Sequence, residues 1–103
     1  MGWKDAASLE DARAVRRWLP LTVDGVDIVL AEVAGTWCGF VDRCTHAGCL
    51  FSEDGELDGW HLTCNCHGSE FDVRTGAVER GPAEQPVRTM PVRVVADRIE
   101  VDL

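Results

Sequence analysis

Short apolar runs, each closed by a pair of turn-forming residues, make up the first half of the chain. One run covers residues 16–23 and ends at Asp24-Gly25, and the next covers 26–33 and ends at Ala34-Gly35. A third run, over 37–41, follows at once. Short β-rich runs separated by such pairs are typical of antiparallel hairpins. We therefore predict antiparallel strands over these three runs.

The second half of the chain continues the pattern. Further strands are predicted at 60–63, 70–73, 87–95 and 99–103. Between them we expect an exposed acidic loop at 53–59, turns at 74–76 and 96–98, and a rigid proline loop at 81–86. Residues 5–14 allow a helical turn but no long helix. The expected fold class is all-β, with one segment inserted between the strands of the first half and the strand predicted at 87–95.

Length and hydropathy limit the number of domains and the cellular location that we expect. A chain of 103 residues is the size of one domain, which we expect to extend over 1–103. No apolar run approaches the roughly 18–20 residues that a membrane-spanning helix needs. The first five residues lack the apolar segment of a signal peptide. We therefore expect a cytoplasmic protein without a membrane partner.

The charge balance excludes some partners. Eighteen acidic residues against ten basic ones give a formal net charge of −8. Nucleic acid and anionic membrane surfaces repel such a chain. A basic protein partner would be attracted to it, although a surplus of acid also serves solubility alone. Charge alone leaves these two interpretations open.

Two short boxes hold most of the side chains that bind transition metals. The first contains Cys44, His46 and Cys49, and the second, 14 residues further on, contains Cys64, Cys66 and His67. Thiolates and imidazoles gathered in this way are typical of a transition-metal site. Each box offers one Cys-His pair, Cys44-x-His46 and Cys64-x-x-His67, and one further cysteine.

The order of cysteine and histidine within the boxes distinguishes between the possible kinds of metal site. Zinc fingers usually place both cysteines in one box and both histidines in the other, so a structural zinc module is the weaker alternative. A plant-type [2Fe–2S] site needs C-x4-C-x2-C. Cys44 and Cys49 fit the first interval, but no cysteine follows two residues later. The mixed boxes fit a Rieske centre, in which two histidines replace two cysteines on one iron.

The sequence resembles the Rieske family over about residues 24–103. The match comprises the two boxes, Gly68 and three short motifs, Phe71-Asp72, Thr75-Gly76 and Gly81-Pro82-Ala83. This resemblance implies an antiparallel β-sandwich base with a small cluster-binding subdomain at about 43–83. It also implies one [2Fe–2S] cluster per chain, with Cys44 and Cys64 on the inner iron and His46 and His67 on the outer iron near the surface. Because the irons are then fully ligated, we expect an electron carrier and no enzyme.

The resemblance assigns roles to several neighbouring residues. In the Rieske proteins of cytochrome bc complexes, cysteines placed like Cys49 and Cys66 form a disulfide, and a serine placed like Ser69 donates a hydrogen bond to a bridging sulfide. A tyrosine often follows two residues later in those proteins, where this chain has Phe71. We therefore expect a Cys49–Cys66 bridge and a reduction potential between those of the low ferredoxin group and the high bc group. Cys38 and His61 are expected to be strand side chains outside the site, in the predicted strands 37–41 and 60–63.

The sequence shares features with two Rieske subfamilies. Size and the F-D-x-x-T-G motif at 71–76 resemble the ferredoxins of multicomponent aromatic-ring dioxygenases, as does the segment 86–92. The extra cysteines and Ser69 instead resemble Rieske subunits of bc-type or arsenite-oxidase-type complexes. An oxygenase domain would also need a 2-His-1-carboxylate iron site, and only His61 lies outside the boxes.

The dioxygenase pattern covers more of the chain, so we expect an electron-shuttle ferredoxin. Its partners would be a flavin-containing ferredoxin reductase and a terminal oxygenase, and the ferredoxin itself is expected to be a monomer. The docking face is predicted to consist of His46, His67, Leu50, Phe51 and Pro82. The acidic segment 53–59 would steer a basic partner to this face.

Overall fold

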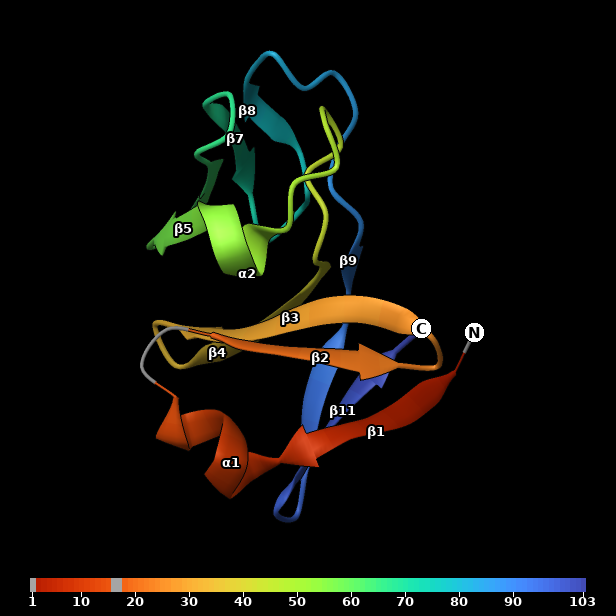
Figure 1. The fold of residues 1–103 in the computed structure, drawn as a ribbon. Helices are drawn as coiled ribbons and strands as arrows, with labels where there is room; N and C mark the ends of the chain where they lie inside the picture. The colour runs from red at the N-terminus through yellow and green to blue at the C-terminus, as the bar shows by residue number, and fades with distance from the viewer. Residues whose placement is uncertain (1, 16–17) are drawn as a thin grey trace.

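Residues 2–15 and 18–103 are described by a computed structural model, in which strands predominate (Figure 1). The N-terminal part contains β1 (Trp3–Ser8), α1 (Leu9–Ala14), β2 (Leu19–Val23), β3 (Val26–Val33) and β4 (Thr36–Val41). The middle part contains α2 (Phe51–Asp54), β5 (Gly55–Asp58), β6 (His61–Cys64), β7 (Ser69–Asp72) and β8 (Val78–Arg80). The chain ends with β9 (Thr89–Met90), β10 (Val92–Val95) and β11 (Arg98–Asp102).

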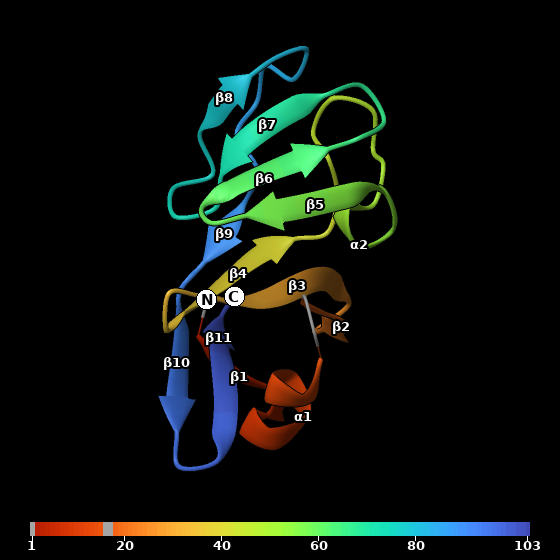
Figure 2. The same cartoon turned by 90° about the vertical axis from the view of Figure 1, so that its left-hand side faces the viewer.

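These strands form three antiparallel sheets. Their orders are β1-β11-β10, β2-β3-β4-β9 and β5-β6-β7-β8. The first two sheets form a sandwich-like base, and the third lies above it with α2 and the loops that carry the two boxes (Figures 1 and 2). The predicted all-β class, with a sandwich base and a smaller upper part, is confirmed.

Strand β3 is buried on both faces and joins two cores. Val29 and Ala31 face the upper core, and Ile28 and Leu30 face the core between the two base sheets. Successive side chains of a strand point to opposite faces. The continuous apolar run that predicted this strand therefore reflects packing on both of its sides.

The upper core is built around a row of aromatic rings. Phe51 packs edge-on against Phe40 and against Phe71, with centroids 5.7 Å apart in each pair. Such edge-to-face pairs are favourable. Phe51 is 0% exposed, so its prediction as a docking residue is wrong. Its side chain instead anchors α2 beneath the first box.

The acidic segment 53–59 is not the exposed loop that its composition predicts. It forms the end of α2 and strand β5, which pairs with β6 through Glu56↔Thr63 and Leu57↔Leu62. Leu57 packs on the upper core while Glu56 and Asp58 are exposed. The alternation of this strand was not recognised because its exposed face is acidic. The tight turn at Gly55 was also missed; a Cβ added at this position would lie 2.7 Å from the Phe51 carbonyl oxygen.

The helical turn predicted within residues 5–14 forms over only part of that segment. Helix α1 forms and is capped by Ser8, whose hydroxyl accepts the Asp11 N–H at 3.0 Å. The residues before it belong to β1, which pairs with β11 at the other end of the chain, for example through Trp3↔Asp102. A partner so distant in sequence leaves no local signal. Of the predicted strand over 16–23, residues 16 and 17 lie outside the described residues.

The predicted strand over 87–95 is divided in two. Thr89–Met90 pairs with β4, whereas Val92–Val95 pairs with β11. Pro91 lies between them and lacks the N–H that a continuous ladder requires. The proline loop at 81–86 contains no strand or helix, as predicted. In the described ranges, no helix is long and apolar enough to cross a membrane.

Candidate metal centre

The two boxes lie in loops that make the same turn. In the first loop the Gly48 N–H donates to the Cys44 carbonyl at 2.9 Å, and in the second the Gly68 N–H donates to the Cys64 carbonyl at 2.9 Å. Both glycines have positive φ, 75° and 83°, a conformation that glycine adopts without steric cost. Each loop thus folds back four residues after its cysteine.

The four predicted ligands form one pair of thiols and one pair of imidazoles in these loops. Cys44 and Cys64 are 2% and 1% exposed. His46 and His67 are exposed, and their ring centroids lie 4.8 Å apart. Two thiols are thus buried and two imidazoles reach the surface. This donor set fits a mixed cysteine-histidine centre.

The two buried thiols interact with each other. Burial, more than any other cause, raises the pKa of the Cys64 thiol. The Cys66 backbone N–H partly opposes this rise, and a hydrogen bond with Cys44 adds to it. Cysteine binds metal as the thiolate. A cation between the two sulfurs would supply the charge that favours that form.

A disulfide joins the two loops. Cys49 and Cys66 are bonded, with Cα atoms 6.8 Å apart, and this pairing confirms the prediction. The Sγ atoms of Cys49, Cys64 and Cys66 all lie within 4.8 Å of one another. Because the bridge removes Cys49 and Cys66 as metal ligands, Cys44 and Cys64 are the thiols that remain in the two boxes.

The proline loop is attached to both ligand loops by hydroxyl groups. Ser69, which is buried, accepts the Ala83 N–H at 3.0 Å. Thr45 donates its hydroxyl hydrogen to the Gln85 carbonyl at 2.6 Å. A serine hydroxyl that accepts one bond still has its own hydrogen to donate; the bond from Ser69 to a bridging sulfide stays a prediction. Pro82 is exposed on this loop.

Sequence reasoning missed several residues that hold the loops. Asp42 is buried, and its carboxylate accepts both the N–H and the hydroxyl of Ser52, at 2.9 and 2.5 Å. No role was predicted for Thr45, although it lies between Cys44 and His46 in the sequence. Nothing in the sequence distinguishes Asp42 from the other acidic residues, because its partner is ten positions away.

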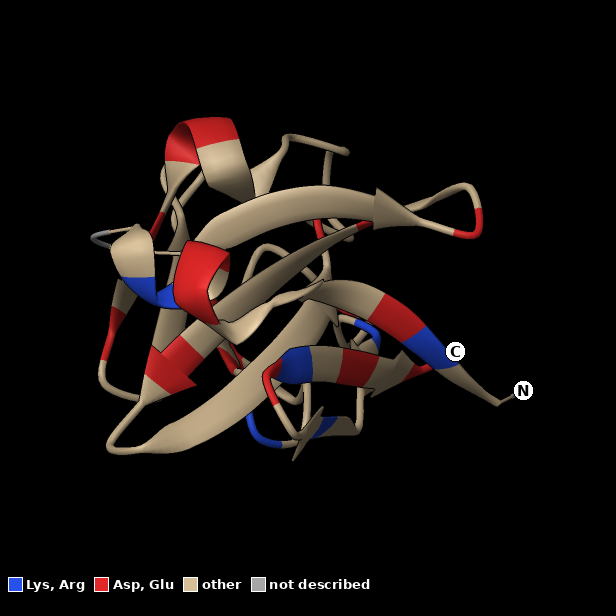
Figure 3. Ribbon diagram, turned by 90° about the horizontal axis from the view of Figure 1, so that it is seen from below, with Lys and Arg blue, Asp and Glu red and all other residues tan. Residues whose placement is uncertain are grey.

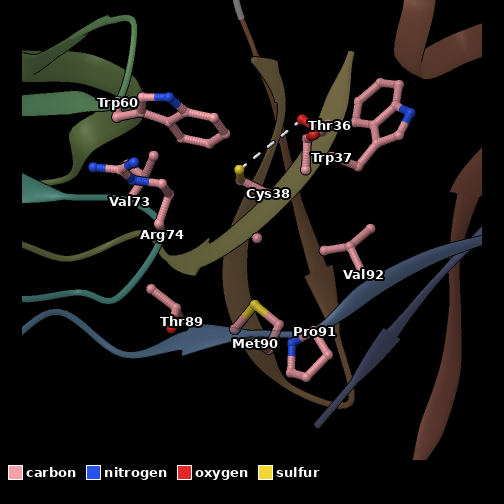
Figure 4. Close-up of a pocket in the computed structure, with 11 residues that line it drawn as sticks. Thr36, Trp37, Cys38, Trp60, Val73, Arg74, Thr89, Met90, Pro91 and Val92 are labelled. Carbon is pink, nitrogen blue, oxygen red and sulfur yellow. Dashed lines mark hydrogen bonds between the residues drawn. The ribbon is translucent and has the colours of Figure 1, made fainter. Parts of the chain in front are cut away.

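Cys38 and His61 lie away from the ligand loops. Cys38 lines a cavity of about 420 Å³ with Trp60 and Met90, and its Sγ lies 4.0 Å from the Thr36 carbonyl oxygen (Figure 4). Burial, with a smaller contribution from Asp72, raises the pKa of the Cys38 thiol. His61 is exposed on β6 and pairs with Glu79.

Ion pairs lie on both halves of the molecule, but one group of exposed acids has none among the described residues. On the base, seen from below, acidic and basic segments lie next to each other (Figure 3), and Arg98–Asp5 and Arg93–Glu100 form ion pairs at 2.7 Å. The exposed acids of α2 and β5 make no ion pair with a described residue. We call this group the acidic ridge; it consists of Glu53, Asp54, Glu56 and Asp58. The Asn65 N–H donates to the Asp54 carbonyl at 2.8 Å, so the ridge lies beside the second ligand loop.

Comparison with known proteins finds relatives in two settings. The ferredoxin component of the naphthalene 1,2-dioxygenase system from Pseudomonas putida is 35% identical over 101 residues, which are 98% of this chain and 95% of that protein. A cytochrome b6-f complex iron-sulfur subunit from Synechocystis sp. is 44% identical over 61 residues, which are 59% of this chain but 33% of that subunit. Full-length similarity is therefore to the ferredoxin component.

Solved structures agree with this pattern. The ferredoxin of carbazole 1,9a-dioxygenase from Nocardioides aromaticivorans superposes with a TM-score of 0.84 at 25% identity, over 98% of this chain and 97% of that one. A chain in the complex of reduced oxygenase and oxidized ferredoxin in carbazole 1,9a-dioxygenase gives a TM-score of 0.83 at 26% identity, over 96% of this chain and 91% of that one.

The family model of the Rieske [2Fe-2S] domain matches residues 2–91. This range includes both ligand loops, the disulfide and the proline loop. It also decides between the metals left open above, in favour of a two-iron cluster and against a structural zinc module. The chain belongs to the Rieske [2Fe-2S] domain family.

Proposed function

We propose that this chain is the ferredoxin component of an aromatic-ring dioxygenase system. It would carry single electrons from a flavin-containing reductase to a terminal oxygenase. One observation carries the proposal: the two ligand loops expose two neighbouring imidazoles and bury two thiols, in a chain that matches a dioxygenase ferredoxin component over 98% of its length.

Within this proposal the four ligands have two tasks. Cys44 and Cys64 would hold the inner iron, and His46 and His67 the outer iron. The bound [2Fe–2S] cluster accepts and releases one electron at a time. Since both imidazoles are exposed, they would be the ligands through which the electron passes to a partner. Cys44 and Cys64 are buried and would face the protein interior.

The docking face would be formed by His46, His67 and Pro82, with half-buried Leu50 at its edge. A small, partly apolar face is suited to short-lived electron-transfer complexes. The acidic ridge beside it would attract a basic surface on the partner and speed the encounter.

Reconstitution tests the proposed function. The purified chain is mixed with the reductase and terminal oxygenase of a naphthalene-type system, and reduction of the oxygenase is followed by its absorbance. We expect the rate to rise with the concentration of this chain, and the cluster-free protein to be inactive. A chain that carries its cluster but transfers no electrons to any such oxygenase would contradict the proposal.

A second candidate is a Rieske subunit of a bc-type, b6-f-type or arsenite-oxidase-type complex. The Cys49–Cys66 bridge and the 44% identity over 61 residues to a b6-f subunit favour it. The match to that subunit extends over 59% of this chain, against 98% for the ferredoxin component, and this speaks against it. Rapid reduction by a quinol-oxidising complex, with none by a dioxygenase reductase, would select this candidate.

We also propose that residues 1–103 fold as one domain that acts as a cytoplasmic monomer. Strand β3 contributes to both cores, which supports cooperative folding of base and upper part. Light scattering on the purified protein tests the monomer, and a single unfolding transition followed both by far-ultraviolet circular dichroism and by cluster absorbance tests the single domain.

A further inference from the structure

The two ligand loops are supported differently. The second loop is the turn between β6 and β7, and the register Cys64↔Ser69 pairs the residues at its two ends. The first loop extends from the end of β4 to the start of α2, two elements that are not paired strands. Inside this loop the Cys44 N–H donates to the Cys49 carbonyl at 2.8 Å, and Thr45 and the disulfide attach the loop to its neighbours. The two ends outside this span have a separate attachment, a pair of side chains.

Asp42 provides this attachment at the start of the loop. It is 5% exposed, and its own N–H donates to the Asp27 carbonyl at 2.9 Å, which fixes it to β3. Its two carboxylate oxygens accept separate hydrogen bonds from Ser52, from the N–H at 2.9 Å and from the hydroxyl at 2.5 Å. A buried carboxylate is costly unless it is satisfied in this way.

Ser52 is a suitable partner at the end of the loop. The first N–H groups of a helix lack partners within the helix, and Leu50, at the N-cap of α2, provides no side-chain bond. Asp42 accepts one of these N–H groups from outside the helix, where negative charge is favourable. Phe51, the neighbour of Ser52, is fixed in the upper core. The pair thus connects two fixed points with the ligand loop between them.

We propose that Asp42 is a positioning residue for the first ligand loop. Through Ser52 it closes the base of the loop and holds Cys44 and His46 in the geometry that the cluster requires. The proposal rests on the proposed ligand set, because only then does the position of this loop determine how firmly the outer iron is held. Loss of a partner that orients metal ligands typically costs on the order of ten to a hundredfold in metal affinity.

The experiment uses four variants of the full chain. Asp42→Asn replaces one accepting oxygen by an amide group, and Ser52→Ala removes the hydroxyl; both leave the ligands untouched. Ser52→Thr keeps a hydroxyl and is the conservative rescue. Asp27→Asn is the matched control, since Asp27 is exposed, lines the same surface hollow as Asp42 and offers Asp42 only its backbone carbonyl.

Two measurements follow the site itself. The rate of cluster loss to a chelator is followed by visible absorbance, and the electron paramagnetic resonance spectrum of the reduced protein reports the surroundings of the outer iron. We expect Asp42→Asn and Ser52→Ala to lose the cluster on the order of tenfold faster and to show shifted spectra. Ser52→Thr and Asp27→Asn should match the wild type.

Different outcomes would contradict the role of Asp42 and the proposed ligand set on which it rests. Wild-type rates and spectra in both Asp42→Asn and Ser52→Ala would overturn it, as would an equal effect of Asp27→Asn. If Asp42→Asn does not fold, the comparison of Ser52→Ala with Ser52→Thr decides alone. A wild-type protein that takes up no iron and sulfide would instead contradict the proposed ligand set.

Discussion

The hydroxyl of Ser69 is buried between the second ligand loop and the proline loop, where it accepts the Ala83 N–H. Hydrogen bonds to the sulfurs of a cluster stabilise its reduced form and raise its potential. Phe71, two residues later, has no hydroxyl to add a second such bond, and the chain contains no tyrosine. At the scale of single residues, we therefore expect Ser69 to be the one side-chain hydroxyl of this pair of positions that raises the potential.

We predict a reduction potential between those of the low-potential Rieske ferredoxins and the high-potential bc group, which lie within about −150 to +300 mV. Ser69→Ala should lower it, because one bond to sulfur is lost. Protein-film voltammetry measures both values. Ser8→Ala, which removes the hydroxyl at the start of α1, is the control and should leave the potential unchanged. A wild-type value squarely inside either group would contradict the prediction.

His61 provides a pH-dependent contribution to stability. Its Nδ1 lies 2.8 Å from Glu79 Oε1, and this hydrogen bond, more than any other cause, raises the pKa of the imidazole. The charged form is thus favoured in the folded protein. The stabilisation is fully present below the ordinary histidine value of about 6.5 and is lost as the pH rises through the folded-state pKa.

Substitution of His61 should therefore destabilise the protein only under acidic conditions. We expect His61→Gln to lower the melting temperature slightly at pH 5.5 and to leave it unchanged at pH 9, as measured by circular dichroism. Glu79→Gln should reproduce this pattern, because it removes the same pair. An equal effect at both pH values would mean that packing, and not charge, is responsible.

At the scale of elements, the ligand loops and the proline loop act as one unit. Cys49–Cys66 joins the two ligand loops, and Ser69 and Thr45 each attach one of them to the proline loop. None of these bonds belongs to a sheet. They give three loops the rigidity that strands have from their ladders, and they hold the ligands between rigid elements.

Removal of the disulfide should show how much of this rigidity it supplies. The bridge spans a sequence separation of 17 residues, and the chain-entropy model assigns about 3 kcal/mol to a loop of this size. We expect the double variant Cys49→Ser, Cys66→Ser to lose roughly that much free energy of unfolding in denaturant titrations. Cys38→Ala, which removes a buried thiol and keeps the bridge, is the control. A loss no larger than that of Cys38→Ala would assign the rigidity to hydrogen bonds alone.

At the scale of the whole molecule, the surplus negative charge is placed where it can act on a partner. Acids on the base are partly neutralised by Lys4, Arg93 and Arg98. The acidic ridge is exposed, has no such pairs among the described residues, and lies beside the second ligand loop. A partner with a basic surface would be drawn toward His46 and His67 before contact.

Neutralisation of the ridge tests this steering. We expect replacement of its four acids by their amides to slow electron transfer to the oxygenase and to weaken its dependence on salt, because long-range attraction is screened by ions. The control variant changes four acids of the base, Glu10, Asp11, Asp24 and Asp97, and alters the net charge equally. Stopped-flow rates at several ionic strengths give the comparison. Unchanged rates in the ridge variant, or equal losses in both variants, would rule out steering by the ridge.

Local patterns predicted much of this structure from the sequence. Strands β2, β3, β4 and β11 follow from apolar runs and turn pairs, because hairpin partners are close in sequence. Errors arose where a distant residue decides the outcome, as for β1 and its partner β11. They also arose at β5, where acidic residues on the exposed face obscured the alternation, and at Phe51, whose aromatic partners come from β4 and β7.

The same division applies to the site. The types of ligand and their spacing could be read from the sequence, because the chemistry of a metal centre depends on which side chains are present and on their order. The disulfide partners were predicted from the resemblance to the Rieske proteins of bc complexes. Folding was needed to show that both imidazoles are exposed while both thiols are buried, and that Asp42 and Ser52 are hydrogen-bonded at the two ends of the first loop. Burial and hydrogen bonding of this kind depend on residues brought together by folding, and such contacts leave no mark in the spacing of neighbours along the chain.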